Sequence, residues 1–258
     1  MKRDRLWQMK QLFLQKRSIR VKELCDAFDI SVETARRDLN ALEEDGIVRR
    51  VYGGAVLVDN TGNQDVMPPW DDRVSLHQRE KRAIAREVLR HIPDDAIIAL
   101  DSGTASYETA RMLREKKNLT VLCNDLRIAA ELSHNTDHTI FFIGGAMKKD
   151  DMITTGFLAT DFLEYFSNID LTILSADGFN VATGLSDHNV EMGTLKAAMI
   201  KRSSRVLAGI DYSKFACKAF YKVCDITDLD MVITDDRTPQ SDIDALKKAG
   251  VTTIVVKA

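Results

Sequence analysis

The chain has 258 residues, of which 45% are hydrophobic and 29% are charged. This composition is typical of a globular protein with one large or two smaller domains, and it excludes a fibrous or disordered chain. The net charge of −3 also excludes a uniformly basic nucleic-acid binder. With no signal peptide and no long apolar run, we expect a cytoplasmic protein that does not span a membrane.

The cysteine and histidine patterns indicate no metal site. Cys25, Cys123, Cys217 and Cys224 are scattered without metal-ligand spacing, which favours reduced thiols in a cytoplasm. The five histidines show no ligand spacing either. We therefore expect no metal and no cofactor.

The first 30 residues show the spacing of two helices. Apolar side chains at helical intervals predict a first helix over 4–16 and a second, short helix over about 24–28. Residues 19–21 leave room for a short strand between them. Asp29 and Ile30 then form a tight turn into Ser31.

The segment that follows has the pattern of a DNA-recognition helix. Ser31 is a candidate N-cap, and Gly46 a candidate C-terminal stop. Ala35, Leu39 and Leu42 recur at i, i+4 and i+7, so they form one apolar stripe. With that stripe facing a core, the polar side chains point away or lie on its flanks, where they can enter the major groove. These side chains are Glu33, Thr34, Arg36, Arg37 and Asn40.

Residues 47–51 and 55–58, joined at Gly53 and Gly54, predict a β-hairpin, which completes the order of a winged helix-turn-helix. Arginine can bind guanine in a bidentate manner, asparagine can bind adenine, and hydroxyls suit phosphates. We expect Asp38, on the inner side of the helix, to pair with an arginine of the wing. The candidate contacts to double-stranded operator DNA are Ser31, Glu33, Thr34, Arg36, Arg37, Asn40, Arg49, Arg50 and Tyr52.

The alternative for this segment is a charged amphipathic surface helix, and the 55-residue pattern as a whole disfavours it. Residues 1–60 hold 12 basic and 10 acidic side chains, a net of +2. Because this charge is small, we expect affinity for DNA to depend on a few placed arginines and on two or more heads per complex.

A polar stretch with two prolines, at 59–74, predicts a linker between a DNA-binding domain at 1–58 and a second domain at 75–258. In the second domain, continuous apolar runs alternate with amphipathic helices, which predicts an α/β fold with a mostly parallel sheet covered on both faces. The predicted strands are 96–100, 119–123, 139–143, 171–176, 206–210, 231–234 and 252–256.

Ligands of such sheets bind at the carboxyl ends of the strands, and several predicted strands end there in suitable residues. The loop DSGTAS at 101–106 offers a glycine and hydroxyls at a helix N-terminus, which suits a phosphate. Alternatively, Asp101 or Ser102 simply caps that helix. Other strand ends offer amides, carboxylates and flexible backbone for sugar hydroxyls. The candidate effector-site residues are Asp101, Ser102, Gly103, Thr104, Asn124, Asp125, Gly144, Gly145, Asp177 and Gly178.

Three further charged residues of the second domain need an interpretation, and Lys214 joins the candidate effector set. Lys214, in the loop after the strand ending at Ile210, is a possible phosphate ligand or a solvated lysine. Glu191 and Lys196 lie on the helix predicted after Ser186, five positions apart. They do not stack on one face, so either is a possible surface charge.

Taken together, these motifs resemble the DeoR family of bacterial transcription regulators, over nearly the whole chain. The resemblance implies a sensor fold similar to ribose-5-phosphate isomerase, a phosphorylated sugar effector that changes DNA affinity, and a homodimer or higher oligomer. It also adds Glu191 to the effector site. The sequence departs from the family pattern at Ala105 and Ser106, at Lys148 and Lys149, and at Ala216. The matching motifs are TARRDL at 34–39, RVYGGA at 50–55, DSGT at 101–104, ND at 124–125, GG at 144–145, ADG at 176–178, GL at 184–185, Glu191 with Lys196, DYSKF at 211–215 and ITD at 233–235.

The sequence thus predicts a repressor of a sugar or polyol catabolism operon rather than an enzyme. One alternative is a sugar-phosphate isomerase that carries a DNA-binding head, for which Asp101, Asp177 and Glu191 are the candidate bases. Another is an architectural DNA-binding oligomer with an empty sensor.

Overall fold

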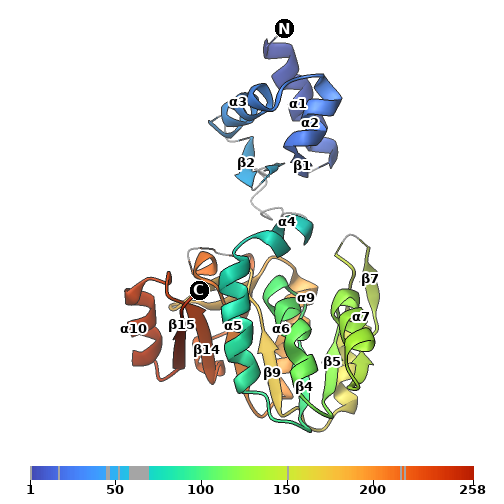
Figure 1. The fold of residues 1–258 in the computed structure, drawn as a ribbon, viewed down its shortest axis with the longest axis vertical. Helices are drawn as coiled ribbons and strands as arrows, with labels where there is room; N and C mark the ends of the chain where they lie inside the picture. Colours follow the sequence, from blue (N-terminus) through green and yellow to red (C-terminus); the bar gives the residue numbers. More distant parts are fainter. Residues whose placement is uncertain are drawn as a thin grey trace. The chain divides into compact units, whose positions relative to one another are not determined.

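The computed structural model describes residues 2–16, 18–44, 47–51, 53–57, 70–149, 151–215, 217 and 219–258. The chain divides into two compact units, Met1–Leu76 and His77–Ala258, which we call the head and the sensor domain (Figure 1). Most of the predicted linker lies outside the described residues. Its last part does not: Trp70–Ser75 form a short helix, α4, within the first unit.

Up to Leu57, the described part of the head has three helices and a three-stranded antiparallel sheet of order β1-β3-β2. The prediction of a helix, a short strand, two further helices and a hairpin is confirmed, although the strand ends at Arg20 and the second helix begins at Val21. The elements are α1 (Lys2–Lys16), β1 (Ser18–Arg20), α2 (Val21–Phe28), α3 (Val32–Glu44), β2 (Val48–Val51) and β3 (Gly54–Leu57).

The apolar stripe of α3 forms the centre of the head's core. Ala35, Leu39 and Leu42 are all buried, and they pack with Phe13 of α1 and Leu24 of α2. Ser31 caps α3 as predicted, because its Oγ accepts the Thr34 N–H at 3.2 Å. The predicted end of the helix at Gly46 lies outside the described residues.

The sensor domain is built on a seven-stranded parallel sheet, and all seven predicted strands are present with small changes in their ends. Its order is β15-β14-β12-β9-β4-β5-β6, with every neighbouring pair parallel. The strands are β4 (Ile97–Leu100), β5 (Thr120–Cys123), β6 (Thr139–Phe142), β9 (Leu171–Leu174), β12 (Val206–Gly209), β14 (Met231–Asp235) and β15 (Thr252–Val256).

Helices cover both faces of this sheet, as the continuous apolar strands predict. One face packs against α5, α6 and α7, which lie in front of the sheet in Figure 1. The other face packs against α8, α9 and α10. These helices are α5 (Gln78–Arg90), α6 (Thr104–Met112), α7 (Leu126–Asn135), α8 (Phe157–Phe162), α9 (Val190–Lys201) and α10 (Gln240–Lys248).

Two smaller β structures in the sensor domain were not predicted. One is an antiparallel hairpin, β7 (Ala146–Lys148) with β8 (Ile153–Thr155). The other is an antiparallel sheet of β10 (Gly178–Asn180), β11 (Gly184–Asp187) and β13 (Tyr221–Cys224). All five of these strands have three or four residues, and several are polar, so they lack the apolar run that identifies a core strand. No described helix is both long and apolar enough to cross a bilayer.

Candidate DNA-binding and effector sites

The polar side of α3 is open, as a recognition helix requires. Glu33, Arg36, Arg37 and Asn40 are exposed, and Thr34 is half-buried. Ser31 is exposed as well, but its hydroxyl already takes part in the cap of α3. The head therefore presents one polar helix face that is held from below by the apolar stripe. Among the predicted DNA contacts, Tyr52 and the side chain of Arg49 lie outside the described residues.

The structure pairs Asp38 with Arg5 of α1 and not with the wing residue Arg50, while the side chain of Arg49, the other predicted partner, lies outside the described residues. Asp38 is 1% exposed, and its Oδ2 accepts a hydrogen bond from Arg5 Nε of α1 at 2.6 Å. This contact raises the pKa of Arg5 above its ordinary value. Since Arg5 lies 33 positions earlier in the chain, no local pattern around Asp38 indicates the pair.

The wing arginine Arg50 contacts the recognition helix in another way. Its Nη1 donates to Asn40 Oδ1 at 2.5 Å and to the Arg36 carbonyl at 3.3 Å. Its backbone N–H donates to Glu43 Oε1 at 2.7 Å. Arg50 therefore fastens β2 to α3, and Asn40 already accepts one hydrogen bond within the head.

In the sensor domain the strand order reverses between β4 and β9. From β4 the chain proceeds to β5 and β6 on one side, and it then returns to β9 on the other side of β4. The carboxyl ends of these two strands flank the crevice in which parallel α/β sheets bind their ligands. The loop at 101–104 follows β4, and Ser175 follows β9.

Three buried charged residues of the sensor domain, Asp101, Asp187 and Lys196, meet next to the ends of β4 and β9. Lys196 Nζ of α9 lies 3.0 Å from Asp101 Oδ2, 2.9 Å from Asp187 Oδ2 and 3.1 Å from the Ser175 carbonyl oxygen. The remaining contacts of Asp101 are with Ser106 Oγ, and with the N–H and Oγ of Ser175, both at 2.9 Å. We call this group the Lys196 cluster.

Burial and charge act against each other in the Lys196 cluster. Burial raises the pKa values of Asp101 and Asp187 above the ordinary aspartate value, and Lys196 opposes this effect. Burial acts to lower the pKa of Lys196, but the carboxylates of Asp187, Asp101 and Asp177 outweigh it and raise the pKa. Lys196 therefore stays protonated and compensates the buried carboxylates.

The N-terminus of α6 is open toward the crevice. Gly103 precedes the helix, and no side chain caps it, which contradicts the alternative that Asp101 or Ser102 does so. By contrast, Asp125 caps α7 and Asn189 caps α9. A side chain at position 103 would not fit, because its Cβ would lie 2.1 Å from Ser175 Oγ.

Asn124, after β5, has a side-chain oxygen that accepts no hydrogen bond in the described structure. It is fully buried, and its Nδ2 donates to the Thr154 carbonyl at 2.9 Å and approaches Met192 Sδ at 3.3 Å. Its Oδ1 has no partner within the described structure. Ser102 Oγ lies 3.9 Å from the same Met192 sulfur. Met192 thus joins the loops after β4 and β5.

The other predicted effector residues have varied surroundings. Asp125 is buried and occupied as the cap of α7, and Asp177 Oδ2 accepts the His188 N–H at 3.3 Å. Glu191 accepts a hydrogen bond from Thr155 Oγ1 at 2.8 Å and lies 3.6 Å from Lys148 Nζ. Gly144 and Gly145 are exposed between β6 and β7, whereas Gly178 is buried in β10.

Lys214 is half-buried at the end of the 3-10 helix Tyr212–Lys214, which follows β12. Within the described structure no hydrogen bond or ion pair joins its side chain to the loop at 101–104. Its loop and that loop nevertheless belong to strands separated only by β9.

Sequence reasoning missed how Lys196, Asp187, Ser175 and Met192 are placed. One signal was present: Lys196 lies within an otherwise apolar stretch, Leu195 to Ile200, in which a lysine has no polar neighbours. Such a lysine is buried only with a charged partner, and the partners come from distant loops.

A helix-turn-helix head joined to a separate α/β sensor domain defines a class, the transcription regulators that respond to a ligand. Two family models match this chain, "DeoR-like helix-turn-helix domain" at residues 5–61 and "DeoR C terminal sensor domain" at residues 76–236. The chain belongs to the DeoR family.

Relatives of this chain match along nearly their full length. The putative aga operon transcriptional repressor of Escherichia coli O157:H7 is 30% identical over 253 residues, covering 98% of this chain and 93% of the relative. The glycerol-3-phosphate regulon repressor of E. coli K12 is 32% identical over 231 residues, covering 90% of each. Among solved structures, ribose 5-phosphate isomerase A from Methanocaldococcus jannaschii has 14% identity and a TM-score of 0.41, covering 54% of this chain and 55% of that one.

Proposed function

We propose that this protein is a cytoplasmic, DNA-binding repressor whose affinity for its operator is controlled by a phosphorylated sugar or polyol. The effector binds at the carboxyl ends of β4, β5 and β9. The observation that carries this proposal is the uncapped N-terminus of α6 at the point where the strand order reverses. Free backbone N–H groups and the helix dipole favour a phosphate there.

The chemistry of the rim supports a sugar next to that phosphate. The unpartnered Oδ1 of Asn124 can accept a hydrogen bond from a hydroxyl. Ser102, Gly103 and Thr104 surround the phosphate. Asp101 does not bind the sugar in this proposal, because both of its oxygens are already engaged. Its role is to hold the loop in place.

The head supplies the DNA contacts. Arg37 and Thr34 reach base edges from the exposed face of α3, and Arg36 and the wing contact the backbone. Two heads in a dimer or higher oligomer bind two half-sites of the operator. The effector shifts the equilibrium between states with high and low DNA affinity, by no more than its difference in affinity for the two states. One relative's name, glycerol-3-phosphate regulon repressor, is consistent with an effector of this chemistry.

A thermal-shift screen tests the effector. The full chain is heated with phosphorylated sugars and polyols, each next to its unphosphorylated parent, because a ligand of the folded state raises the midpoint by mass action. We expect a phosphorylated compound to raise the midpoint and its parent to have little effect. If no phosphorylated compound does so in a protein that still binds DNA, the sugar-phosphate proposal is wrong.

Ser102→Ala locates the site. Among the described residues, the Ser102 hydroxyl makes only the long contact to Met192, so its removal should leave the midpoint of the free protein unchanged. The shift caused by the effector should decrease. Ser133→Ala, at an exposed position on α7, is the matched control and should keep the full shift.

A further inference from the structure

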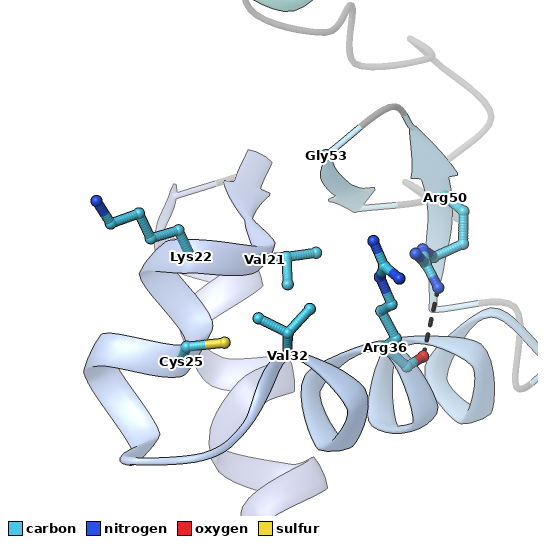
Figure 2. Close-up of a pocket in the computed structure, with 7 residues that line it drawn as sticks. All are labelled: Val21, Lys22, Cys25, Val32, Arg36, Arg50 and Gly53. Carbon is cyan, nitrogen blue, oxygen red and sulfur yellow. Dashed lines mark hydrogen bonds between the residues drawn. The ribbon is translucent and has the colours of Figure 1, made fainter.

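The head contains a cavity of about 380 Å³ that is formed by three separate elements (Figure 2). The N-terminal half of α2 forms one wall, the first turns of α3 form the floor, and the wing closes the far end. The lining residues are Val21, Lys22, Cys25, Val32, Arg36, Arg50 and Gly53.

The middle of the cavity is apolar. The side chains of Val21 and Val32 point toward each other, and the sulfur of Cys25 points into the same space (Figure 2). Val32 is 49% exposed although it is the first residue of α3 and an aliphatic side chain. This surface suits a small apolar group that arrives from outside the head.

The two ends of the cavity are cationic. Arg36 and Arg50 lie next to each other at one end, and Lys22 lies on the opposite side of the valines (Figure 2). Across the described residues, no carboxylate forms an ion pair with any of these three side chains. Two guanidinium groups side by side repel each other, so an anion between them is favoured.

Arg50 is held in a fixed position. Its Nη1 is bound to Asn40 and to the Arg36 carbonyl, which ties the guanidinium to α3. Its Nε is shielded from solvent and has no acceptor in the described structure. A shielded donor without an acceptor is costly, so an oxygen that reaches it from outside gains this hydrogen bond.

We propose that this cavity holds the backbone of one DNA strand. One phosphate lies at Arg36 and Arg50, the adjoining deoxyribose lies over Val21 and Val32, and the next phosphate lies at Lys22. The alternation of cation, apolar surface and cation matches the alternation of phosphate, sugar and phosphate along a strand. Arg36 and Arg50 then set the register of the head on DNA, and base reading falls to Arg37 and its neighbours on the open face.

This proposal rests on the DNA-binding function, and the first experiment separates the two. The full-length protein selects its preferred site from random-sequence duplex DNA. Failure of the wild type to select any sequence would overturn the proposed function itself. With a selected site in hand, all further comparisons are made between variants on the same DNA.

The salt dependence of affinity then separates phosphate contacts from base contacts. Each phosphate contact contributes about 0.9 to the slope of log affinity against log salt. Arg36→Ala and Lys22→Ala should each reduce the slope by about one while leaving the base preferences unchanged. Arg37→Ala should instead relax the preference at one base pair. Lys10→Ala, at an exposed position of α1, is the charge control and should leave both properties unchanged.

Single methylphosphonate substitutions locate the two phosphates, because each replaces one charged phosphate by a neutral group. For the wild-type protein, methylphosphonate substitution at either of two successive phosphates on one strand should weaken binding. Arg36→Ala should become less sensitive to one of the two substitutions, because Arg50 still contacts that phosphate, and Lys22→Ala should become insensitive to the other. Sensitivity at positions that are not successive, or a change of base preference in Arg36→Ala with an unchanged salt slope, would overturn the proposal.

Alkylation of Cys25 reports directly on occupancy of the cavity. Cys25 is partly exposed there, and Cys217 of the sensor domain is exposed and provides an internal reference. When the selected DNA is added, the rate of N-ethylmaleimide modification at Cys25, measured by peptide mass spectrometry, should fall in proportion to the bound fraction. The rate at Cys217 should remain unchanged. Equal rates at Cys25 with and without DNA would contradict a strand in the cavity.

Discussion

In the head, the cations that line the cavity are exposed or half-buried and have no carboxylate partner among the described residues, whereas in the sensor domain the ammonium of Lys196 is buried and contacts two carboxylates and a carbonyl oxygen. The difference follows from what each set of charges has to do. A cation that binds an external anion must keep its charge available. A cation that positions a loop must be neutralised inside the protein, because an unpaired buried charge costs several kcal/mol.

This comparison predicts that charge removal acts on stability in the sensor domain and on DNA affinity in the head. The Lys196 cluster links the loop after β4, the end of β9, β11 and α9, so a break in it affects every side of the crevice. The arginines of the cavity are exposed or half-buried, and their removal leaves the core of the head intact.

The largest effect is expected for Lys196→Met. The substitution leaves Asp101 and Asp187 buried without their cation, which should lower the free energy of unfolding of the sensor domain by about 3–5 kcal/mol. Lys201→Met, at an exposed position on the same helix, is the control and should have little effect. Urea denaturation of both variants measures the difference, and equal stabilities would refute the structural role of Lys196.

The loss in Lys196→Met should also depend on pH. Without the cation, burial raises the pKa values of Asp101 and Asp187 further above the ordinary aspartate value of about 3.9. Between that value and the raised values, the folded state binds more protons than the unfolded state, so stability falls as pH rises. The variant should therefore be least stable near neutral pH and regain stability on acidification toward pH 5. In the wild type, Lys196 contributes its full amount to the free energy of unfolding below its unfolded pKa of about 10.4. That contribution is lost as the pH rises from this value through the raised pKa of the folded state.

A smaller effect is expected for the pair of Asp38 and Arg5 in the head. Asp38→Ala removes the acceptor of the partly buried Arg5 guanidinium and should destabilise the head by about 1.5–3 kcal/mol. Asp26→Ala, at an exposed position of α2, serves as the control. Denaturant titration followed by a probe in the head gives the result. A loss no larger than that of the control would show that the Arg5 contact is as weak as a surface ion pair.

Gly103→Ala tests the close approach of the loop to β9. The new Cβ would lie 2.1 Å from Ser175 Oγ, so the Ser175 hydroxyl must leave Asp101. Strain of this kind costs about 1–3 kcal/mol. The thermal shift caused by the effector should be lost as well, since the N-terminus of α6 is displaced. Gly250→Ala also replaces a glycine of positive φ but has open space around its new Cβ, so it controls for backbone strain without the close approach. If Gly103→Ala kept the full thermal shift with the effector, the loop at 101–104 would not be part of the effector site.

The smallest effect is expected for Glu191→Gln. Its ion pair with Lys148 is 3.6 Å long and joins side chains that are 52% and 36% exposed. Such pairs contribute about 0–1 kcal/mol. The midpoint of the free protein should therefore hardly change, and any change in the effector shift would report on ligand contact instead. A large loss of stability would show that the contrast with Lys196 is wrong.

Much of the fold could be predicted because it depends on local patterns. The stripe Ala35, Leu39 and Leu42 identified the recognition helix, and Ser31 identified its start. The seven core strands were found because both faces of the sheet are covered, which makes each strand a continuous apolar run. The hairpin and the small antiparallel sheet were missed since their strands are short and carry no such run.

The candidate sites could be predicted only in part. The loop at 101–106 was identified as a helix N-terminus, but whether a side chain caps it was left open. Asp101 was assigned to a sugar hydroxyl because its partners, Ser175 and Lys196, lie 74 and 95 positions away. In the same way, Lys22 and Val32 belong to separate helices, and neither alone indicates a cavity.

The sequence by itself determined the order of the elements, the two domains and the face of α3 that is open to DNA, since helix periodicity, capping and apolar runs are properties of neighbouring residues. The tertiary structure decided which charges are paired and which are free. In the folded protein Lys196 is buried between Asp101 and Asp187, Asp38 pairs with Arg5, and Arg36 and Arg50 line the cavity. The physical reason is that the energy of a charge depends on its burial and on its partners, and both come from distant parts of the chain.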